Sequence, residues 1–345
     1  MKKFIALLIL SITVLSLAFS FGCKQTEDLE VYCPDGAPAL SLAKILYDDE
    51  VIETKDYGYD INIVSAQNIQ TYVTGESPKA DIAVLPVNQA SKLLGSGETY
   101  TLIGGITHGN LYLLKKGNSL ENITSQNVTT ALIGKTVGVI NIANVPGLTF
   151  KAILSDKGVS YNEIKDGNVA VADKVNLKGV EATEVVPNSD CDYFVVPEPA
   201  LSTKIKMTAD KPLPLTLAGN LQELYSQELK AYPQAVVVVK NTLLDKREKK
   251  VKEFISLLKE NQDWIKSEET DISAIVSAIE EGLISDDMQR TFSTANLNTT
   301  VIKNCAINFV SAKDYKAEIL AYIQKINALS NQAFGSLSDK FFYEG

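Results

Sequence analysis

The sequence predicts an α/β protein built from two lobes. Short β-prone runs alternate with helical patterns along most of the chain, an arrangement typical of βαβ units around a parallel sheet. This alternation occurs twice, and β-prone segments near residues 110–116 and 232–240 join the two sets. From about residue 247 onward the apolar residues recur with helical spacing instead.

In the first lobe, each predicted strand runs into a short loop and then into a helix. The strands are the β-prone runs at 29–34, 59–65 and 80–85. Helices are expected at 39–46, from about 69, and at 89–94. The loops Asp35-Gly36-Ala37-Pro38 and Pro86-Val87-Asn88 contain residues that interrupt regular structure.

The second lobe repeats this order, and a helical tail follows it. Strands are expected at 110–114, 135–140, 192–196 and 213–217, with helices at 149–157 and from about 200. After the strand at 234–240, helices are expected at 247–264, 272–279 and 317–329. We therefore expect lobe 1 to comprise residues 29–113 and 236–345, and lobe 2 to comprise residues 114–235.

The first 22 residues predict a secretory signal peptide. A lysine-containing start is followed by an almost wholly apolar run to Phe21, and the chain turns polar directly after Gly22-Cys23. The Gly-Cys pair resembles a bacterial lipobox, so we expect Cys23 to carry lipid, to begin a linker at 23–28 and to anchor an extracytoplasmic protein to the membrane. The alternative is a membrane-spanning anchor, because about 18 apolar residues can cross a bilayer.

Composition excludes several classes of function. The 345-residue chain has a formal charge of −9, which makes it a poor general binder of nucleic acid because affinity for phosphate backbones needs clustered positive charge. Arg247 and Arg290 are its only arginines and His108 its only histidine. A lone histidine cannot build a histidine-rich metal site or supply a catalytic triad without partners. We therefore expect no metal, no cofactor and no enzymatic activity.

Two further motifs are interpreted as structural. Besides Cys23, the chain has Cys33, Cys191 and Cys305, which allow at most one disulfide and lack zinc-site spacing, so we expect small buried thiols. The segment Gly134-Lys135-Thr136 resembles the end of a phosphate-binding loop. That loop needs a glycine five residues before Gly134, and Thr129 stands there instead.

Several segments, taken in order, resemble the solute-binding proteins of ABC importers. They are PDGAPALSLAKIL (34–46), ADIAVLPVNQASKLL (80–94), GNLYLLKKG (109–117), IGKTVGVIN (133–141), DYFVVPEPALST (192–203), YPQAVVVVK (232–240) and DKFFY (339–343). Within that group the chain is similar to the branch that binds nitrate, sulfonates, taurine and thiamine precursors. The resemblance implies a type II periplasmic-binding fold, in which two hinged α/β lobes close on a solute. It also implies an ABC permease and its ATPase as partners, and we expect a monomer.

The candidate binding residues lie mostly in loops that follow predicted strands. Ligands of open parallel sheets bind beyond the carboxyl ends of the strands, so these loops are expected to line the interlobe cleft. The candidates are Tyr32, Asp35, Gly36, Ala37, Pro38, Gln67, Pro86, Asn88, His108, Pro146, Gly147, Thr149, Glu198, Tyr232 and Gln234.

Each candidate also has a purely structural interpretation. The helix starts after Asp35 and near Pro146 offer free N–H groups to a ligand, but Asn88 and Thr149 would serve equally well as helix caps. Glu198, between two prolines, would accept hydrogen bonds from a solute amine or amide, or would favour the helix dipole. Tyr32 and Tyr232 would stack on a flat solute, although Tyr32 also suits the core. His108 suits either the hinge or a structural position.

Neither arginine falls in the candidate loops, so an arginine clamp on a carboxylate, sulfonate or phosphate is not expected. The polar candidates suit a neutral or weakly basic planar solute with N–H donors, for instance a heteroaromatic vitamin precursor such as an aminopyrimidine. Two other classes remain. One is an enzyme of pyrimidine or menaquinone chemistry on the same fold, and the other is a lipoprotein with a sensory or adhesive role.

Overall fold

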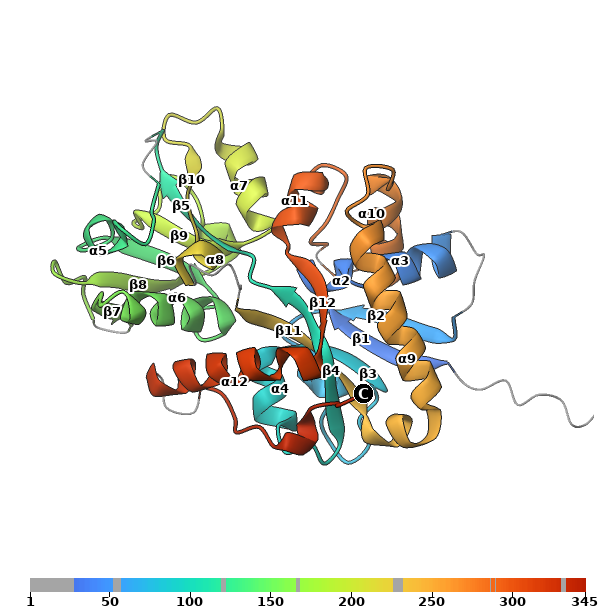
Figure 1. The fold of residues 1–345 in the computed structure, drawn as a ribbon. Coiled ribbons are helices and arrows are strands. Elements are labelled where there is room, and N and C mark those ends of the chain that lie inside the picture. Colours follow the sequence, from blue (N-terminus) through green and yellow to red (C-terminus); the bar gives the residue numbers. More distant parts are fainter. Residues whose placement is uncertain are drawn as a thin grey trace, which may run out of the picture.

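The computed structural model describes residues 28–51, 57–118, 122–165, 168–225, 232–285, 287–288, 290–329 and 333–345. The predicted signal peptide and the lipidation residue Cys23 lie outside these ranges. The described chain forms two lobes, each built on one six-stranded sheet with helices on both faces (Figure 1). The prediction of two α/β lobes is thereby confirmed.

The sheet of lobe 1 has the strand order β12-β4-β11-β3-β1-β2. Its strands are β1 (Leu29–Pro34), β2 (Tyr59–Val64), β3 (Ile82–Pro86), β4 (Tyr100–His108), β11 (Pro233–Lys240) and β12 (Ile307–Ser311). Strands β2, β1 and β3 are parallel, whereas β11, β4 and β12 add in antiparallel fashion. The sheet is therefore mixed rather than purely parallel as the sequence predicted, because the chain returns from lobe 2 in the opposite direction.

The sheet of lobe 2 has the order β10-β5-β9-β6-β8-β7. Its strands are β5 (Leu111–Lys116), β6 (Thr136–Ile140), β7 (Tyr161–Ile164), β8 (Val175–Val180), β9 (Tyr193–Pro197) and β10 (Leu215–Asn220). Here β7, β8, β6 and β9 are parallel, and β5 and β10 are antiparallel. The two lobes thus share one plan, with parallel strands on one side and antiparallel strands beside the junction.

Helices cover both faces of each sheet. Lobe 1 has α2 (Ala37–Leu40), α3 (Ala43–Leu46), α4 (Val87–Leu94), α9 (Asn241–Trp264), α10 (Ile272–Glu281), α11 (Thr299–Asn304) and α12 (Ala312–Leu329). Lobe 2 has α5 (Val128–Ala131), α6 (Val145–Asp156), α7 (Ala200–Thr208) and α8 (Leu221–Tyr225). Shorter turns occur at η1 (Tyr47–Val51), η2 (Ile69–Tyr72), η3 (Ala182–Glu184) and η4 (Asp339–Phe341). In the part of the chain that is described, no helix combines the length and the apolar character needed to cross a bilayer.

One apolar core runs through both lobes. Successive residues of a strand point to opposite faces of the sheet, so Val31 and Cys33 pack under α9 and α10 while Tyr32 joins the other face. That other face, which carries α4 and α12, is continuous with the core of lobe 2 around Phe150 and Val195. The lobes are therefore packed against each other along one side rather than joined by the crossover segments alone.

Several boundaries differ from the predicted ones. Strand β4 was not expected, and the helix predicted from about 69 is a single 3₁₀ turn. The first crossover lies at Gly109-Asn110, so the predicted lobe boundary at 113 falls inside β5 and that at 235 falls inside β11. These shifts arise because each crossover continues directly into a strand of the next sheet.

A buried asparagine fixes the segment that follows the first strand. Asn261 of α9 is fully buried; its Oδ1 accepts the N–H of Lys44 at 2.9 Å, and its Nδ2 donates to the carbonyl of Leu40 at 3.0 Å. Both backbone groups lie where α2 gives way to α3, and ends of short helices need such partners. Asn261 therefore holds the α2–α3 segment, and with it the Asp35-Gly36 loop, against α9.

We expect Asn261→Ala to lower the free energy of unfolding by about 2–4 kcal/mol, because two buried backbone groups lose their partners. Urea denaturation followed by circular dichroism measures this loss. The control is Glu260→Ala, at the adjacent exposed position, which should change stability by less than about 0.5 kcal/mol. Equal stabilities of the two variants would contradict the assignment.

Candidate functional site

The carboxyl ends of parallel strands from both lobes meet at the interlobe junction. In lobe 1, β1 leads into the Asp35-Gly36 loop and β3 leads directly into α4. In lobe 2, β6 leads to α6 through Asn144, and β9 leads to α7 through Glu198. Ligands of α/β sheets bind beyond such strand ends. This junction is therefore the candidate site.

Two asparagines form a direct bond between the lobes. Asn88, 5% exposed, donates from Nδ2 to Oδ1 of Asn144 at 3.2 Å. Asn88 lies in the first turn of α4, which Pro86 caps, and Asn144 is the N-cap of α6. The alternative in which Asn88 or Thr149 caps its helix is thus wrong, because α4 begins two residues and α6 four residues earlier than predicted. The starts of α4 and α6 consequently face each other.

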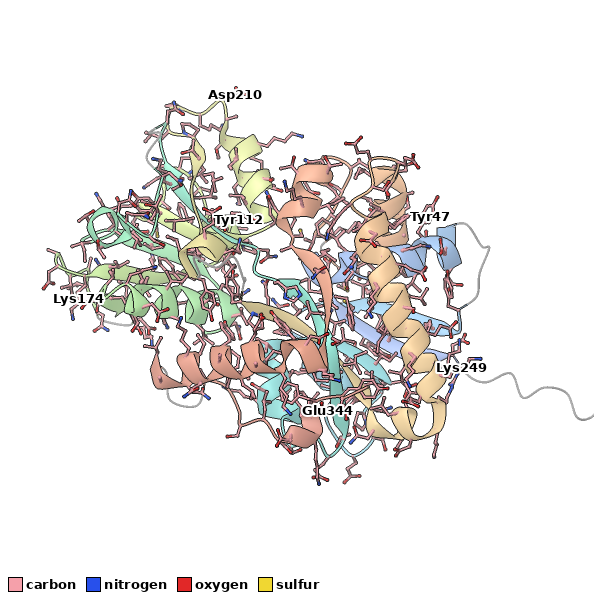
Figure 2. All side chains as sticks on the ribbon, in the orientation of Figure 1. Tyr47, Tyr112, Lys174, Asp210, Lys249 and Glu344 are labelled. Atoms are coloured by element: carbon pink, nitrogen blue, oxygen red, sulfur yellow. The ribbon has the colours of Figure 1, made fainter. Side chains whose placement is uncertain are left out.

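Glu198 is the buried carboxylate of the junction. It is 2% exposed and accepts hydrogen bonds from the N–H of Ser202 at 3.1 Å and from its hydroxyl at 2.7 Å. A third bond comes across the junction from Nδ2 of Asn304 at 3.0 Å. Tyr112, labelled in Figure 2 on β5, donates to the carbonyl of Asn304 at 3.1 Å, and burial together with the Glu198 charge raises the pKa of Tyr112. Glu198 therefore bonds to both lobes at once.

The two crossovers are tied together by Gln222 of α8. Its Oε1 accepts the N–H of Leu111, directly after the first crossover, at 3.1 Å. The same oxygen accepts the hydroxyl of Tyr232, directly before β11, at 2.9 Å. Gly109, at φ +72°, allows this arrangement, since a Cβ there would come 2.5 Å from the Gln222 side chain. Neighbouring Gln234 donates from Nε2 to Oδ1 of Asn110 at 2.8 Å.

Several buried polar oxygens near the junction lack a hydrogen-bond partner among the described residues. They are Oδ1 of Asn88, Oε1 of Gln89, Oγ1 of Thr107 and Oε1 of Gln234. Ala235 of β11 pairs with both Pro86 of β3 and Thr107 of β4, so Thr107 and Gln234 lie at the same end of the lobe 1 sheet as the start of α4. Buried polar atoms normally have partners, so this group marks a place where a bound molecule would be stabilised.

His108 has both ring nitrogens engaged. Nε2 lies 2.7 Å from the carbonyl of Asn308, which can only accept, so Nε2 carries the proton. Nδ1 then accepts the hydroxyl of Tyr315 at 2.7 Å. Burial lowers the pKa of His108, partly opposed by the bond to Asn308. The single histidine is thus held neutral beside the first crossover.

The two aromatic candidates are largely covered by other aromatic rings. Tyr32 is 4% exposed, stacks on Tyr72 at 4.1 Å between ring centroids, and donates to Glu30 at 3.0 Å. Tyr232 is fully buried and stacks on Tyr322 at 6.2 Å. Stacking of either ring on a solute stays a prediction, and it requires these neighbours to move.

The remaining candidates divide between exposed and engaged positions. Asp35 accepts the N–H of Gly36 at 2.7 Å and that of Thr291 at 3.0 Å, which holds the loop at the end of β1. Gly36 has a φ of +101°, a backbone conformation that other residues rarely adopt. Ala37 is buried in α2 beside half-buried Pro38. Gln67 is exposed and bonds only to Ser65 among the described contacts.

The start of α6 contains three further candidates, Pro146, Gly147 and Thr149. Pro146 occupies the first turn, and Gly147 can carry no side chain because a Cβ would lie 1.9 Å from the carbonyl oxygen of Ile142. Thr149 is fully buried inside α6 and its hydroxyl bonds to Tyr322 of α12 at 2.6 Å. Of these three candidates, only Pro146 is partly exposed.

A hollow beside Asn144 was not anticipated from the sequence. It has a volume of about 250 Å³ and is lined by Asn141, Ile142, Ala143, Asn144, Gly179, Val180, Glu181 and Glu184, at the carboxyl ends of β6 and β8. Asn144 joins it to Asn88 of lobe 1. Amide side chains carry no periodic signal, so the sequence did not identify Asn110, Asn144, Gln222 or Asn304 as candidates. Of these, only Asn144 could have been found, from its position after a predicted strand.

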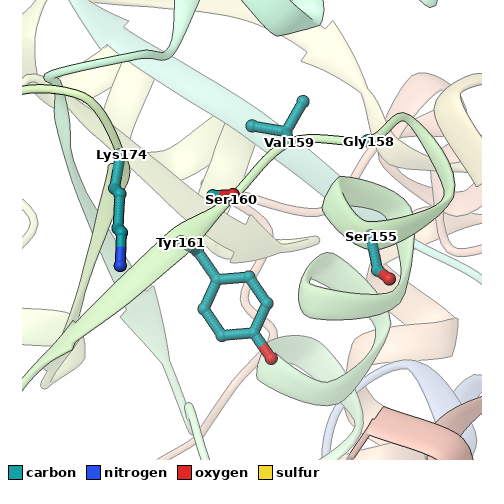
Figure 3. A pocket seen from close by; sticks show the side chains of 6 residues that line it. All are labelled: Ser155, Gly158, Val159, Ser160, Tyr161 and Lys174. Carbon is teal, nitrogen blue, oxygen red and sulfur yellow. The ribbon is translucent and has the colours of Figure 1, made fainter.

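A second hollow, of about 420 Å³, lies away from the junction. Ser155, Gly158, Val159, Ser160, Tyr161 and Lys174 line it (Figure 3). It sits past the far end of α6, about 18 Å of helix from Asn144 at 1.5 Å per residue. None of the candidate residues borders it, so it is not part of the site.

Neither arginine side chain enters the described junction. Arg290 is exposed and pairs with Glu280 at 2.7 Å, and Arg247 lies at the kink of α9. Among the described residues, no cluster of His, Cys, Asp and Glu side chains has the arrangement to hold a metal ion. The described junction therefore presents amides, hydroxyls and the Glu198 carboxylate, with Asp35 at the end of β1 and Glu181 and Glu184 in the hollow beside Asn144.

Solved structures with the same architecture are known. A protein described as an ABC transporter from Parabacteroides distasonis matches with a TM-score of 0.66 and 18% identity, over 92% of this chain and 99% of that one. The chain has the periplasmic-binding-protein fold. The aliphatic sulphonate binding protein SsuA of Escherichia coli matches with a TM-score of 0.57 and 11% identity, over 89% and 94% of the two chains. The nitrate-binding protein NrtA of Synechocystis PCC 6803 gives 0.54 and 12%, over 89% and 82%.

No protein-family model matches the sequence, and no curated protein does either. The identities to the solved structures are low, so the similarity establishes the fold. The predicted type II periplasmic-binding fold, with its two α/β lobes, is confirmed.

The neutral state of His108 makes stability depend on pH. Because the folded chain binds this proton more weakly than the unfolded chain, stability is complete above the unfolded pKa of about 6.5 and falls as the pH drops toward the folded pKa. The loss approaches about 1.4 kcal/mol per pH unit in that window. Urea titrations between about pH 7.5 and 5 should show this slope in the natural chain and a flatter one in His108→Gln. Parallel slopes would show that His108 titrates normally.

Proposed function

We propose that this protein is the extracytoplasmic solute-binding receptor of an ABC importer. The observation that carries the proposal is the pairing of the α4 and α6 starts through Asn88 and Asn144, on a fold shared with periplasmic binding proteins. Clefts between lobes are favoured sites for small molecules. A solute held there bonds to both lobes, so its binding favours the closed arrangement of the lobes, which the permease recognises.

The solute is a small neutral or weakly basic ring compound with N–H donors, such as a heteroaromatic vitamin precursor. The unpartnered oxygens of Asn88, Thr107 and Gln234 accept hydrogen bonds, and the Glu198 carboxylate only accepts. A donor-bearing solute would satisfy these oxygens, whereas leaving them unpaired in a closed site is costly. Such a solute differs from the anions in the names of SsuA and NrtA, which present only acceptor oxygens.

The surroundings also argue against a strong anion. A sulfonate or nitrate needs positive side chains or several free N–H groups. The described arginine side chains lie outside the junction, and Glu198 adds a negative charge to it. The remaining donors are backbone N–H groups at the helix starts, the Thr107 hydroxyl and side-chain amides, none of which carries a full positive charge.

The receptor would deliver its solute to a permease in the membrane. Lipid on Cys23 would keep the receptor at the membrane surface, which raises its effective concentration near the permease and its ATPase. We propose a monomeric, non-enzymatic receptor, because the site residues have the chemistry of binding. The one histidine near the junction is occupied by two structural bonds.

Thermal melts of residues 24–345 against a panel of compounds test the proposal. The panel holds pyrimidines, purines, thiamine, riboflavin, sulfonates, nitrate and phosphonates. A ligand at about 100 times its Kd adds about 2.7 kcal/mol, which raises the Tm by a few degrees. We expect a shift with a ring compound that carries N–H donors.

The matched variants are Asn88→Ala, at the junction, and Asn168→Ala, at an exposed position of lobe 2. Asn88→Ala should reduce the shift by weakening binding about tenfold, since a buried hydrogen bond to the solute is lost. Asn168→Ala should leave it unchanged. A shift with sulfonate or nitrate alone would overturn the assignment of the solute, and catalytic turnover of a panel compound would overturn the receptor role.

A further inference from the structure

The last long helix belongs to both lobes. Helix α12 follows β12 and packs with its first half on lobe 1, where Tyr315 bonds to His108 at 2.7 Å. Its second half extends alongside α6 of lobe 2 (Figure 1). The helix therefore crosses the junction on the face where the apolar core is continuous between the lobes.

The first link from α12 to lobe 2 is Tyr322. This side chain is fully buried, and its hydroxyl lies 2.6 Å from Oγ1 of Thr149 in α6. Its ring stacks on Tyr232 and meets the edge of Tyr225, the last residue of α8. A tyrosine from lobe 1 is thus seated between two helices of lobe 2 and the second crossover.

The second link is Lys325, one helical turn further on. Its Nζ forms an ion pair with Asp156 and lies 4.6 Å above the ring of Tyr225. Asp156 is the last residue of α6, where the partial negative charge of the helix end adds to the attraction for a cation. One lysine therefore holds the ends of α6 and α8 together against α12.

On each helix, the two residues that make these links lie on one side. Thr149 and Asp156 lie seven residues apart on α6, which places them on one side of that helix, and Tyr322 and Lys325 lie three apart on α12. The contacts thus dock one helix face on another at two points. Such a docked face resists rotation of one lobe against the other more than a single bond would.

We propose that α12 is a strap that holds lobe 2 in the arrangement where Asn88 meets Asn144 and Glu198 meets Asn304. A contact favours one arrangement over another only when it is lost in the other. The Tyr322 and Lys325 contacts join residues of different lobes, so a rotation at the crossovers breaks them. The strap then sets how often the junction opens, whatever solute enters it.

Helix α12 also contains a matched control. Lys316, in its first half, pairs with Asp339 at 3.0 Å and lies 5.1 Å above the ring of Phe342. Lys316 also lies 3.4 Å from a carboxylate oxygen of Glu344, so it makes the same two kinds of contact as Lys325 with one further, longer ion pair, and all its partners belong to lobe 1. Lys316→Met and Lys325→Met therefore remove the same chemistry from one helix, and only the second removes a link between lobes.

The experiment measures the distance between the lobes in residues 24–345, which contain every described residue, without any solute. Spin labels are placed at Met207→Cys on α7 and Ser256→Cys on α9, both exposed, while the native described cysteines are buried. Pulsed electron spin resonance then gives the distance distribution. The labelled chain with no further change should show one main short distance.

We expect Lys325→Met to lower the population of that distance about threefold or more, because an exposed ion pair and a cation–π contact each shift an equilibrium by about two- to fivefold. Asp156→Asn should act in the same direction, and the double variant should go no further than the larger single effect. Tyr322→Phe, which removes only a hydroxyl, should also broaden the distribution.

Lys316→Met should leave the distribution unchanged. Equal distributions in Lys325→Met, Tyr322→Phe and the unchanged chain would overturn the strap, as would equal shifts in Lys316→Met and Lys325→Met. Circular dichroism of each variant confirms that the fold is kept. Because no solute is used, these outcomes are independent of those of the solute panel.

Discussion

The connection between the lobes depends on the two crossovers lying side by side, which the pairing of β4 with β11 and one side-chain oxygen maintain. Oε1 of Gln222 accepts a backbone N–H just after the first crossover and a tyrosine hydroxyl just before the strand that follows the second. The chain passes between the sheets at these two places, and Gln222 holds them next to each other. Every other contact across the junction presupposes that the crossovers run side by side.

Two kinds of contact join the lobes around the crossovers, one apolar and one polar. On one face, an apolar core that includes Tyr322 and Phe150 continues from lobe to lobe, and apolar contacts hold surfaces together without specifying direction. At the strand ends, amides and one carboxylate meet, and hydrogen bonds specify direction closely. The apolar core holds the lobes together, and the hydrogen-bonding groups at the strand ends select which molecule can bind between them.

The sequence predicted best those elements whose burial is complete. Strands β3, β9 and β11 are buried runs bounded by proline or lysine, and their places follow from that pattern. Strand β4 was missed because Gly104 and Gly105 weaken its strand signal, yet both glycines are required by contact with Phe309 and Tyr315. β12 is short and lies at a sheet edge, and only two of its five residues are buried, which leaves little pattern.

The site could be located from the sequence more readily than it could be described. Loops after strands identified Asp35, Asn88 and Glu198, because the position of a loop is a local property. Their partners are not local: Asn304 lies 106 residues from Glu198 and Asn144 lies 56 from Asn88. Tyr232, predicted to stack on a solute, is covered in this structure by Tyr225 and Tyr322, a burial that depends on a helix far along the chain.

The buried cysteines determine under which redox conditions the chain can fold. Cys33, Cys191 and Cys305 are free thiols inside the described structure, and burial raises the pKa of each, that of Cys191 to about 11. Thiolates are the form that oxidants attack, so these side chains react slowly. No disulfide joins these three described cysteines, so the chain can fold in a reducing cell interior as well as outside the cell. Recombinant production in an ordinary bacterial cytosol is therefore compatible with the native structure.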